Sequence, residues 1–121
     1  MTDPNLVLLY VDDPVGSVVF YSGLLGREPV EASESFAMFE MKPGVMLGLW
    51  SRHTVKPLAT SPGGQEIAFT VANEDEVQAM HDAWAMRGMT IAQEPIKMDF
   101  GHTFVALDPD GHRLRVFAPA A

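Results

Sequence analysis

The sequence Phe104-Val105-Ala106-Leu107-Asp108-Pro109-Asp110-Gly111-His112-Arg113-Leu114-Arg115-Val116-Phe117 decides the fold of this chain. Two alternating apolar runs flank the Asp-Pro-Asp-Gly segment at its centre. Proline presets φ for the second turn position, and glycine takes the left-handed position that closes the loop. The stretch therefore predicts a β-hairpin with a three-residue loop and a glycine bulge.

A similar hairpin with a different turn is expected earlier, where Lys42-Pro43-Gly44 separates two apolar runs. A glycine-bulge loop pairing Met41 with Val45 would put Phe36 opposite Trp50 and Met38 opposite Gly48. The same kind of register in the closing hairpin would place Thr103 beside Phe117 and Val105 beside Arg115. A slip of one residue would exchange the two faces of each strand.

The rest of the chain repeats one pattern twice, so we expect a duplicated half. Asp13, Pro14 and Gly26 are signals for the start and end of a first helix, and Asn73 and Gly88 for a second. The expected strands lie at 5–11, 29–32, 36–41, 45–50, 66–71, 90–97, 103–107 and 113–117. The order is βαβββ, linker, βαβββ.

This order predicts an α+β fold in which two βαβββ modules form curved mixed sheets around a concave ligand cavity. We expect a single domain over residues 1–121. Module one covers about 4–51, and module two about 65–119. The segment at about 52–64 contains Pro57, Pro62, Gly63 and Gly64 without periodicity, and is interpreted as a linker.

Each predicted helix should bury one apolar side. For the first helix this side consists of Val15, Val18, Val19, Tyr21 and Leu25. For the second helix it consists of Val77, Met80 and Trp84, and Trp84 is interpreted as a core residue.

Composition argues against several classes of protein. Eight Lys and Arg residues against sixteen Asp and Glu residues give a net charge of −8, which argues against nucleic-acid binding. The absence of cysteine excludes a disulfide framework, a Cys-ligated metal and a thiolate nucleophile. No signal peptide or membrane helix is visible in the sequence. We therefore expect a cytoplasmic protein that does not interact with a membrane.

Strand alternation predicts which side chains point away from the helix, on the opposite face of each sheet. In the second half, Ile67, Phe69 and Val71 form the uniformly large apolar set and should meet the helix. The opposite, open face should then carry Glu66, Ala68, Thr70, Arg113, Arg115 and Phe117 in module two, and Leu6, Leu8, Tyr10, Met46, Gly48 and Trp50 in module one.

Three motifs together resemble the vicinal oxygen chelate superfamily, which includes glyoxalase I, extradiol dioxygenases, and fosfomycin and bleomycin resistance proteins. They are the opening Leu-Val-Leu-Leu-Tyr-Val-Asp-Asp (6–13), Phe20-Tyr21 with Leu24-Leu25-Gly26, and Asp108-Pro109-Asp110-Gly111-His112. The segments 101–105 and 49–51 look most similar to a branch that confers resistance to phenazine antibiotics.

The resemblance implies where a divalent metal would bind in metal-dependent members. Carried over onto this chain, the ligand positions are Leu6, Gly48, Glu66 and Arg115. Only Glu66 offers a donor, whereas a divalent metal normally takes three or more from the protein. We therefore expect no metal and no other cofactor, and predict that Glu66 and Arg115 form an ion pair at this position.

The candidate ligand-binding residues are those expected on or near the open faces. Trp50 and Phe36 could stack on a flat aromatic ligand, with Gly48 leaving room beside them. Adaptable lining would come from the two methionines. The full set is Trp50, Phe36, Met38, Met46, Gly48, Tyr10, Glu66, His102, Thr103 and Arg115; no catalytic residue is assigned.

The favoured hypothesis is a metal-independent protein, more a binder than an enzyme, that sequesters a planar aromatic compound such as an antibiotic. The alternative is a metal-dependent glyoxalase-like lyase, isomerase or dioxygenase with a displaced site, for example Glu66, His102 and Glu40. A third hypothesis uses Glu66 as a base in a metal-free enzyme, but pairing with Arg115 would weaken that base. Family members often dimerise, so a homodimer is expected.

Overall fold

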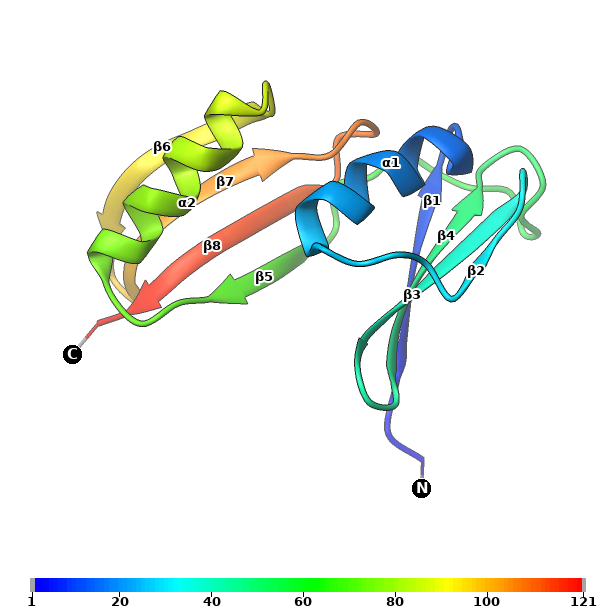
Figure 1. Ribbon diagram of the computed structural model, residues 1–121, viewed down its shortest axis with the longest axis horizontal. Coiled ribbons are helices and arrows are strands. Elements are labelled where there is room, and N and C mark those ends of the chain that lie inside the picture. The colour runs from blue at the N-terminus through cyan, green and yellow to red at the C-terminus, as the bar shows by residue number, and fades with distance from the viewer. Residues whose placement is uncertain (1, 121) are drawn as a thin grey trace. The chain divides into compact units, whose positions relative to one another are not determined.

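A computed structural model of the protein describes residues 2–120, and these form two helices and eight strands (Figure 1). The elements are β1 (Leu6–Val11), α1 (Pro14–Leu25), β2 (Glu31–Ala32), β3 (Phe36–Lys42), β4 (Val45–Ser51), β5 (Glu66–Thr70), α2 (Glu74–Met86), β6 (Thr90–Met98), β7 (Gly101–Leu107) and β8 (Arg113–Pro119). They fall into two compact units, the first ending at Ser61 and the second beginning at Pro62. Neither helix is long and apolar enough to cross a membrane.

Each unit contains one four-stranded mixed sheet and one helix. The strand order is β1-β4-β3-β2 in the first unit and β5-β8-β7-β6 in the second. In both units the first strand runs parallel to its neighbour, and the other pairs are antiparallel. The second sheet curves around α2, which covers one of its faces (Figure 1). The α+β fold of two βαβββ modules is therefore confirmed.

The turn between β7 and β8 has the predicted form. The Asp108 N–H donates to the carbonyl of His112 at 2.9 Å, which leaves a three-residue loop. Gly111 lies in the left-handed region at φ +89°. In addition, the buried Asp108 carboxylate accepts hydrogen bonds from the N–H groups of Asp110 at 2.9 Å and His112 at 2.8 Å. One side chain therefore satisfies two backbone donors within the loop.

The register of β7 and β8 also agrees with the prediction. Thr103 pairs with Phe117 and Val105 pairs with Arg115. The alternate residues of β8, Leu114 and Val116, are fully buried. Since a shift of one residue would exchange the two faces, this pairing determines which side chains lie opposite the helix.

Aromatic contacts hold α2 on its sheet. The ring of Trp84 lies 5.5 Å from that of Phe69 and 5.4 Å from that of Phe104, both edge to face. Trp84 is 5% exposed, which confirms its interpretation as a core residue. The helix begins as predicted, because the Asn73 side chain accepts from the N–H of Glu76 at 2.9 Å.

His81 provides a polar contact on the same helix. Its ring meets Phe104 edge to face, and its nitrogens lie 3.0 Å from Asp82 Oδ1 and 3.2 Å from Glu94 Oε1. The Asp82 carboxylate, with Glu94, raises the pKa of His81 against a smaller lowering by burial. Because Glu94 belongs to β6, His81 links α2 to the edge of its sheet.

The first helix presents a different side from the one predicted. Its buried residues are Pro14, Ser17 and Tyr21, whereas Val15 is 55% and Val19 73% exposed. Only Tyr21 of these was expected to be buried, and the prediction for Val15 and Val19 was wrong. The helix carries no charged residue, so its sequence holds no polar stripe that could mark the solvent side. Its predicted end is correct.

The first hairpin also differs in detail at its turn. Lys42 pairs with Val45, and Met41 forms a bulge, so the predicted Met41–Val45 pair was wrong. Beyond the bulge the predicted register is confirmed, with Phe36 opposite Trp50. The strand continues one residue further than expected, and the bulge absorbs that extra residue without changing the faces.

We expect Asp108→Ala to lower the free energy of unfolding by about 2–3 kcal/mol, because two backbone N–H groups lose a charged acceptor. Asp108→Asn is the matched control, since it keeps an acceptor oxygen in the same shape and should cost less than about 1 kcal/mol. Urea denaturation of the three proteins measures both values. Equal losses in the two variants would contradict this account of the turn.

Candidate functional site

An ion pair joins β5 and β8 on the open face of the second sheet. Arg115 Nε donates to Glu66 Oε1 at 2.8 Å, and Arg115 Nη2 donates to Glu66 Oε2 at 3.0 Å. This is a bidentate arrangement, the strongest form of a guanidinium–carboxylate contact. Hydrogen bonding from Arg115 is the main cause that lowers the pKa of Glu66, against a smaller raising effect of burial. The predicted pairing of these two residues is present.

Three further side chains hold the Arg115 guanidinium. Arg115 Nη1 donates to Thr103 Oγ1 at 3.1 Å and to Gln93 Oε1 at 3.3 Å. Thr103 is fully buried, and its hydroxyl donates to the carbonyl of Val116 at 2.8 Å. The ring of Phe100 lies 5.8 Å from the guanidinium carbon. The position of the Arg115 side chain is therefore fixed by Glu66, Thr103, Gln93 and Phe100.

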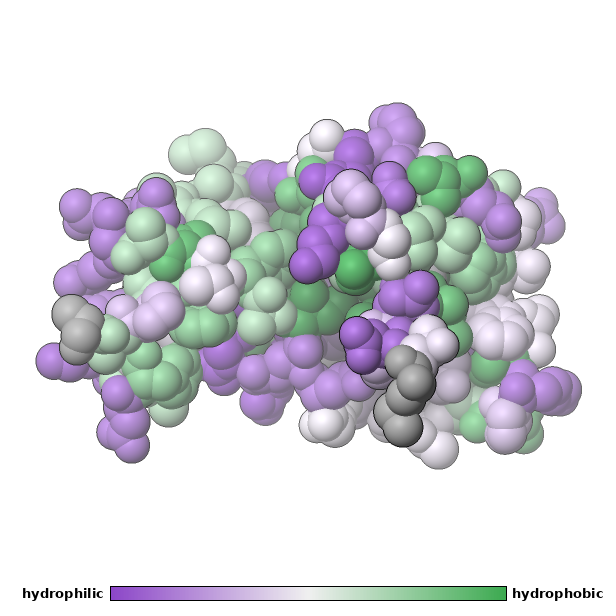
Figure 2. Space-filling model, turned by 90° about the horizontal axis from the view of Figure 1, so that it is seen from below, coloured by the Kyte–Doolittle hydropathy of each residue, from purple (hydrophilic) through white to green (hydrophobic). Residues whose placement is uncertain are grey.

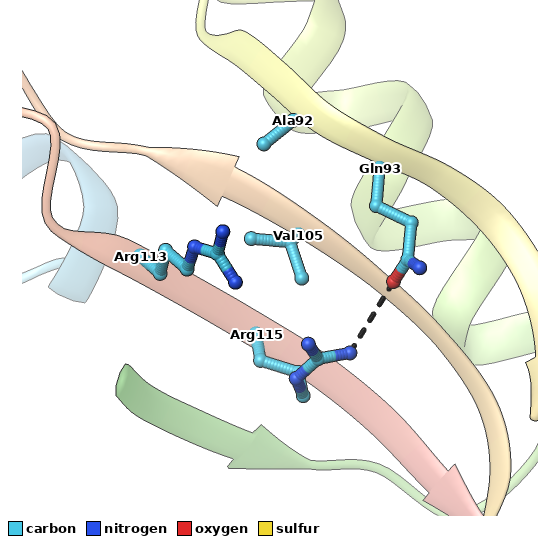
Figure 3. Close-up of a pocket in the computed structure, with 5 residues that line it drawn as sticks. All are labelled: Ala92, Gln93, Val105, Arg113 and Arg115. Carbon is cyan, nitrogen blue, oxygen red and sulfur yellow. Dashed lines mark hydrogen bonds between the residues drawn. The ribbon is translucent and has the colours of Figure 1, made fainter. Parts of the chain in front are cut away.

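A cavity of about 150 Å³ opens beside this ion pair. It is lined by Ala92, Gln93, Val105, Arg113 and Arg115, and Figure 3 shows both arginine side chains reaching it from β8. Arg113 pairs with Glu66 along the strands, but its Nη1 lies 3.8 Å from Glu66 Oε2, beyond hydrogen-bond distance. The cavity thus combines one fixed and one exposed guanidinium.

The open face of the first sheet is aromatic. The rings of Phe36 and Trp50 meet edge to face with centroids 6.1 Å apart, and both residues are half-buried. Tyr10 pairs with Trp50 on the neighbouring strand and is 39% exposed. Leu6, on the same strand face, is 43% exposed. Hydrophobic residues also reach the surface, among hydrophilic ones, in the view of Figure 2.

Gly48 does not leave the room that the sequence analysis expected. A Cβ atom at this position would lie 2.6 Å from Leu8 Cδ2 and 3.2 Å from Phe36 Cζ. The protein's own side chains already occupy the space, because Leu8 pairs directly with Gly48. Met38 also pairs with Gly48, and Met46 lies two residues along β4; both methionines are half-buried.

His102 does not join the other candidates. Its Nε2 lies 3.1 Å from Glu74 Oε1 at the start of α2, so the side chain is directed to the helix side of the sheet. Thr103, the next residue, has the opposite orientation and contacts Arg115. Alternation along β7 therefore separates His102 from the ion pair.

The residues at the metal positions that the resemblance implies do not fit a divalent metal. Arg115 brings a positive guanidinium that already occupies both oxygens of Glu66. Gly48 is covered by Leu8, and Leu6 has no donor atom. Within either unit of the described chain, no three His, Asp or Glu side chains come together as a metal site would require.

Comparison with known proteins shows the family to which the chain belongs. A profile of the glyoxalase/bleomycin resistance protein/dioxygenase superfamily matches residues 4–116. The chain belongs to this superfamily. The phenazine antibiotic resistance protein EhpR of Enterobacter agglomerans is 30% identical over 116 residues, covering 93% of this chain and 89% of that protein.

Solved structures agree with this membership. The solution NMR structure of protein ATC0852 from Agrobacterium tumefaciens is 50% identical, covers both chains completely and has a TM-score of 0.92. A glyoxalase/bleomycin resistance protein/dioxygenase from Nocardioides is 27% identical, with 98% of this chain and 85% of that chain covered and a TM-score of 0.80.

Sequence reasoning missed two residues at the ion pair, Gln93 and Phe100. Gln93 lies on β6 between two register shifts, so alternation could not place its side chain. Phe100 precedes β7, outside any predicted strand. Arg113 was expected on the open face but not chosen as a site residue, although its spacing of two from Arg115 was the available signal.

We expect the Glu66–Arg115 pair to make stability depend on acid pH. The pKa of Glu66 is lowered in the folded state, so its contribution is present above the unfolded pKa and lost as pH falls through the folded value. Urea denaturation between about pH 6 and pH 3 should therefore show a steeper loss for the wild type than for Glu66→Gln. Glu28→Gln, the same substitution at an exposed position of the first unit, should follow the wild-type slope. Parallel curves for wild type and Glu66→Gln would contradict the expectation.

Proposed function

We propose that this protein binds and sequesters a planar aromatic small molecule in the cytoplasm, without a metal and without catalysing a reaction. The observation that carries the proposal is the bidentate Glu66–Arg115 pair at the positions where metal-dependent relatives hold their ion. A guanidinium cannot serve as a metal ligand, and its charge repels a cation. The relative EhpR is a phenazine antibiotic resistance protein, which supports an aromatic ligand.

Each open sheet face, taken by itself, supplies residues to the proposal. Tyr10, Phe36 and Trp50 supply aromatic rings on the first, and an aromatic pair contributes about 0.5–1.5 kcal/mol beyond the area that it buries. The half-buried Met38 and Met46 adapt their shape to a ligand beside these rings. Thr103 is buried, so we assign it the positioning of Arg115 rather than direct contact.

The electrostatics of Glu66 support binding rather than catalysis. A general base works best with a pKa near the working pH, whereas pairing with Arg115 moves the pKa of Glu66 further below that range. His102, the other candidate for proton transfer, is engaged by Glu74 on the helix side of the sheet. We therefore assign no catalytic residue.

We expect Trp50→Ala to weaken phenazine binding about tenfold, because the variant loses a stacking surface. Isothermal titration calorimetry with phenazine measures the affinity in each protein. Trp84→Phe is the matched control, since Trp84 lies in the core of the other unit and its replacement should leave the affinity unchanged. Unchanged binding in Trp50→Ala would remove the stacking role.

Metal analysis of protein purified without an affinity tag tests the rest of the proposal. Stoichiometric nickel, manganese, iron or zinc would instead favour a metal-dependent lyase, isomerase or dioxygenase. Failure of a panel of planar aromatic compounds to bind would also overturn the proposed function.

We further propose that the protein acts as a homodimer, because each open sheet face is a single wall and a ligand of this class needs enclosure. Large apolar groups on the first face remain accessible, with Leu6 43% and Tyr10 39% exposed. Light scattering coupled to size-exclusion chromatography should give about twice the mass of one chain. A mass of one chain at micromolar concentration would contradict the dimer.

A further inference from the structure

The cavity beside Arg115 has an unusual charge for this chain. The sequence has only eight basic residues against sixteen acidic ones, yet two of the eight line one cavity of about 150 Å³. The only carboxylate within ion-pair distance of these arginines among the described residues is that of Glu66. Two guanidinium groups and one carboxylate leave an excess of one positive charge, in a protein with a net charge of −8.

The two arginines differ in what they offer to a ligand. Arg115 directs its donors to Glu66, Thr103 and Gln93, so its geometry is set by the protein. Arg113 is 57% exposed at its side chain, and its contact with Glu66 at 3.8 Å is too long for a hydrogen bond. Figure 3 shows its guanidinium extending beside Val105 into the cavity. The excess charge therefore belongs to a group that retains donors for a ligand.

We propose that Arg113 binds the carboxylate group of an aromatic acid at this cavity of the second unit, with the fixed charge of Arg115 adding to the attraction. This inference rests on the proposed function and names the chemical class of its ligand, a planar aromatic monoanion. A carboxylate matches the planar fork of a guanidinium and accepts two parallel hydrogen bonds from it. The volume of the cavity suits such a substituent rather than a fused ring system.

The surroundings of Arg113 strengthen this attraction. The same cavity is also lined by the exposed Ala92 and by Val105, which is only 2% exposed. An ion pair beside low-polarity groups is less screened by water than one on an open surface. Because Arg113 is itself partly exposed, we expect a moderate preference that weakens as salt is added.

The first experiment tests the anion site at Arg113 independently of phenazine binding. Benzoate and benzamide have nearly the same shape and differ in charge, so each is titrated into ¹⁵N-labelled protein and followed by NMR. Benzoate should shift the backbone signals of Ala92, Gln93 and Arg113 saturably, and benzamide should not. The shifts should disappear in Arg113→Gln, persist in part in Arg113→Lys, and remain in Arg87→Gln, where the same charge is lost at the end of α2 outside the cavity.

The second experiment compares phenazine-1-carboxylate with neutral phenazine by calorimetry. The wild type should bind the carboxylate about tenfold more tightly, which corresponds to about 1.4 kcal/mol. Arg113→Gln should lose this preference and keep its affinity for phenazine. Equal wild-type affinities, or benzoate shifts that survive in Arg113→Gln, overturn the inference and leave the proposed function standing. If benzoate binds at Arg113 but neither phenazine binds, the anion site stands and the proposed aromatic ligand is wrong.

Discussion

Alternation along β8 is the constraint on which the second unit depends. Its buried residues Leu114 and Val116 pack against the helix side, and this orientation turns Arg113 and Arg115 to the open face. The choice is made at the preceding turn, where the Asp108 carboxylate accepts two backbone N–H groups and holds a three-residue loop. A register shift of one residue would exchange the two sets and bury the guanidinium groups, at a large cost in desolvation. Core packing and the charge of the cavity are thus set by one turn.

The two hairpins show how far sequence reasoning reaches. In the closing hairpin the turn residues and the alternation agree, and both register and loop follow from them. In the first hairpin the register was correct, but the bulge at Met41 was not foreseen, because Pro-Gly turns do not by themselves determine loop length. Helix α1 failed for a different reason, since an apolar segment without charges gives no sign of which side faces water. The Glu66–Arg115 pair was predicted from the ligand positions that the family resemblance implies, because strand pairing by itself places Glu66 opposite Arg113.

The two units have the same topology but chemically different open faces. The first carries the rings of Phe36 and Trp50, and the chain's own Leu8 covers the nearby Gly48. The second carries an ion pair whose supporting groups come from β6, from β7 and from the turn between these strands. Gln93 contacts Arg115 because the pairing of β6 is irregular on both sides of Gln93. The alternation of residues in the sequence could not predict this orientation of its side chain. The two units therefore share one backbone pattern, and a few outward residues make one open face apolar and the other charged.

Every ladder of paired strands is closed within its own half of the chain, and none joins β1–β4 to β5–β8. The connecting segment holds one buried anchor, Val55, before an exposed stretch that includes Leu58. Cutting or lengthening the chain after Leu58 consequently breaks no strand pairing. Each half of the sequence therefore contains all the strands of one sheet. Circular permutation, or replacement of one half by that of a relative, would leave the strand pairing of each sheet intact.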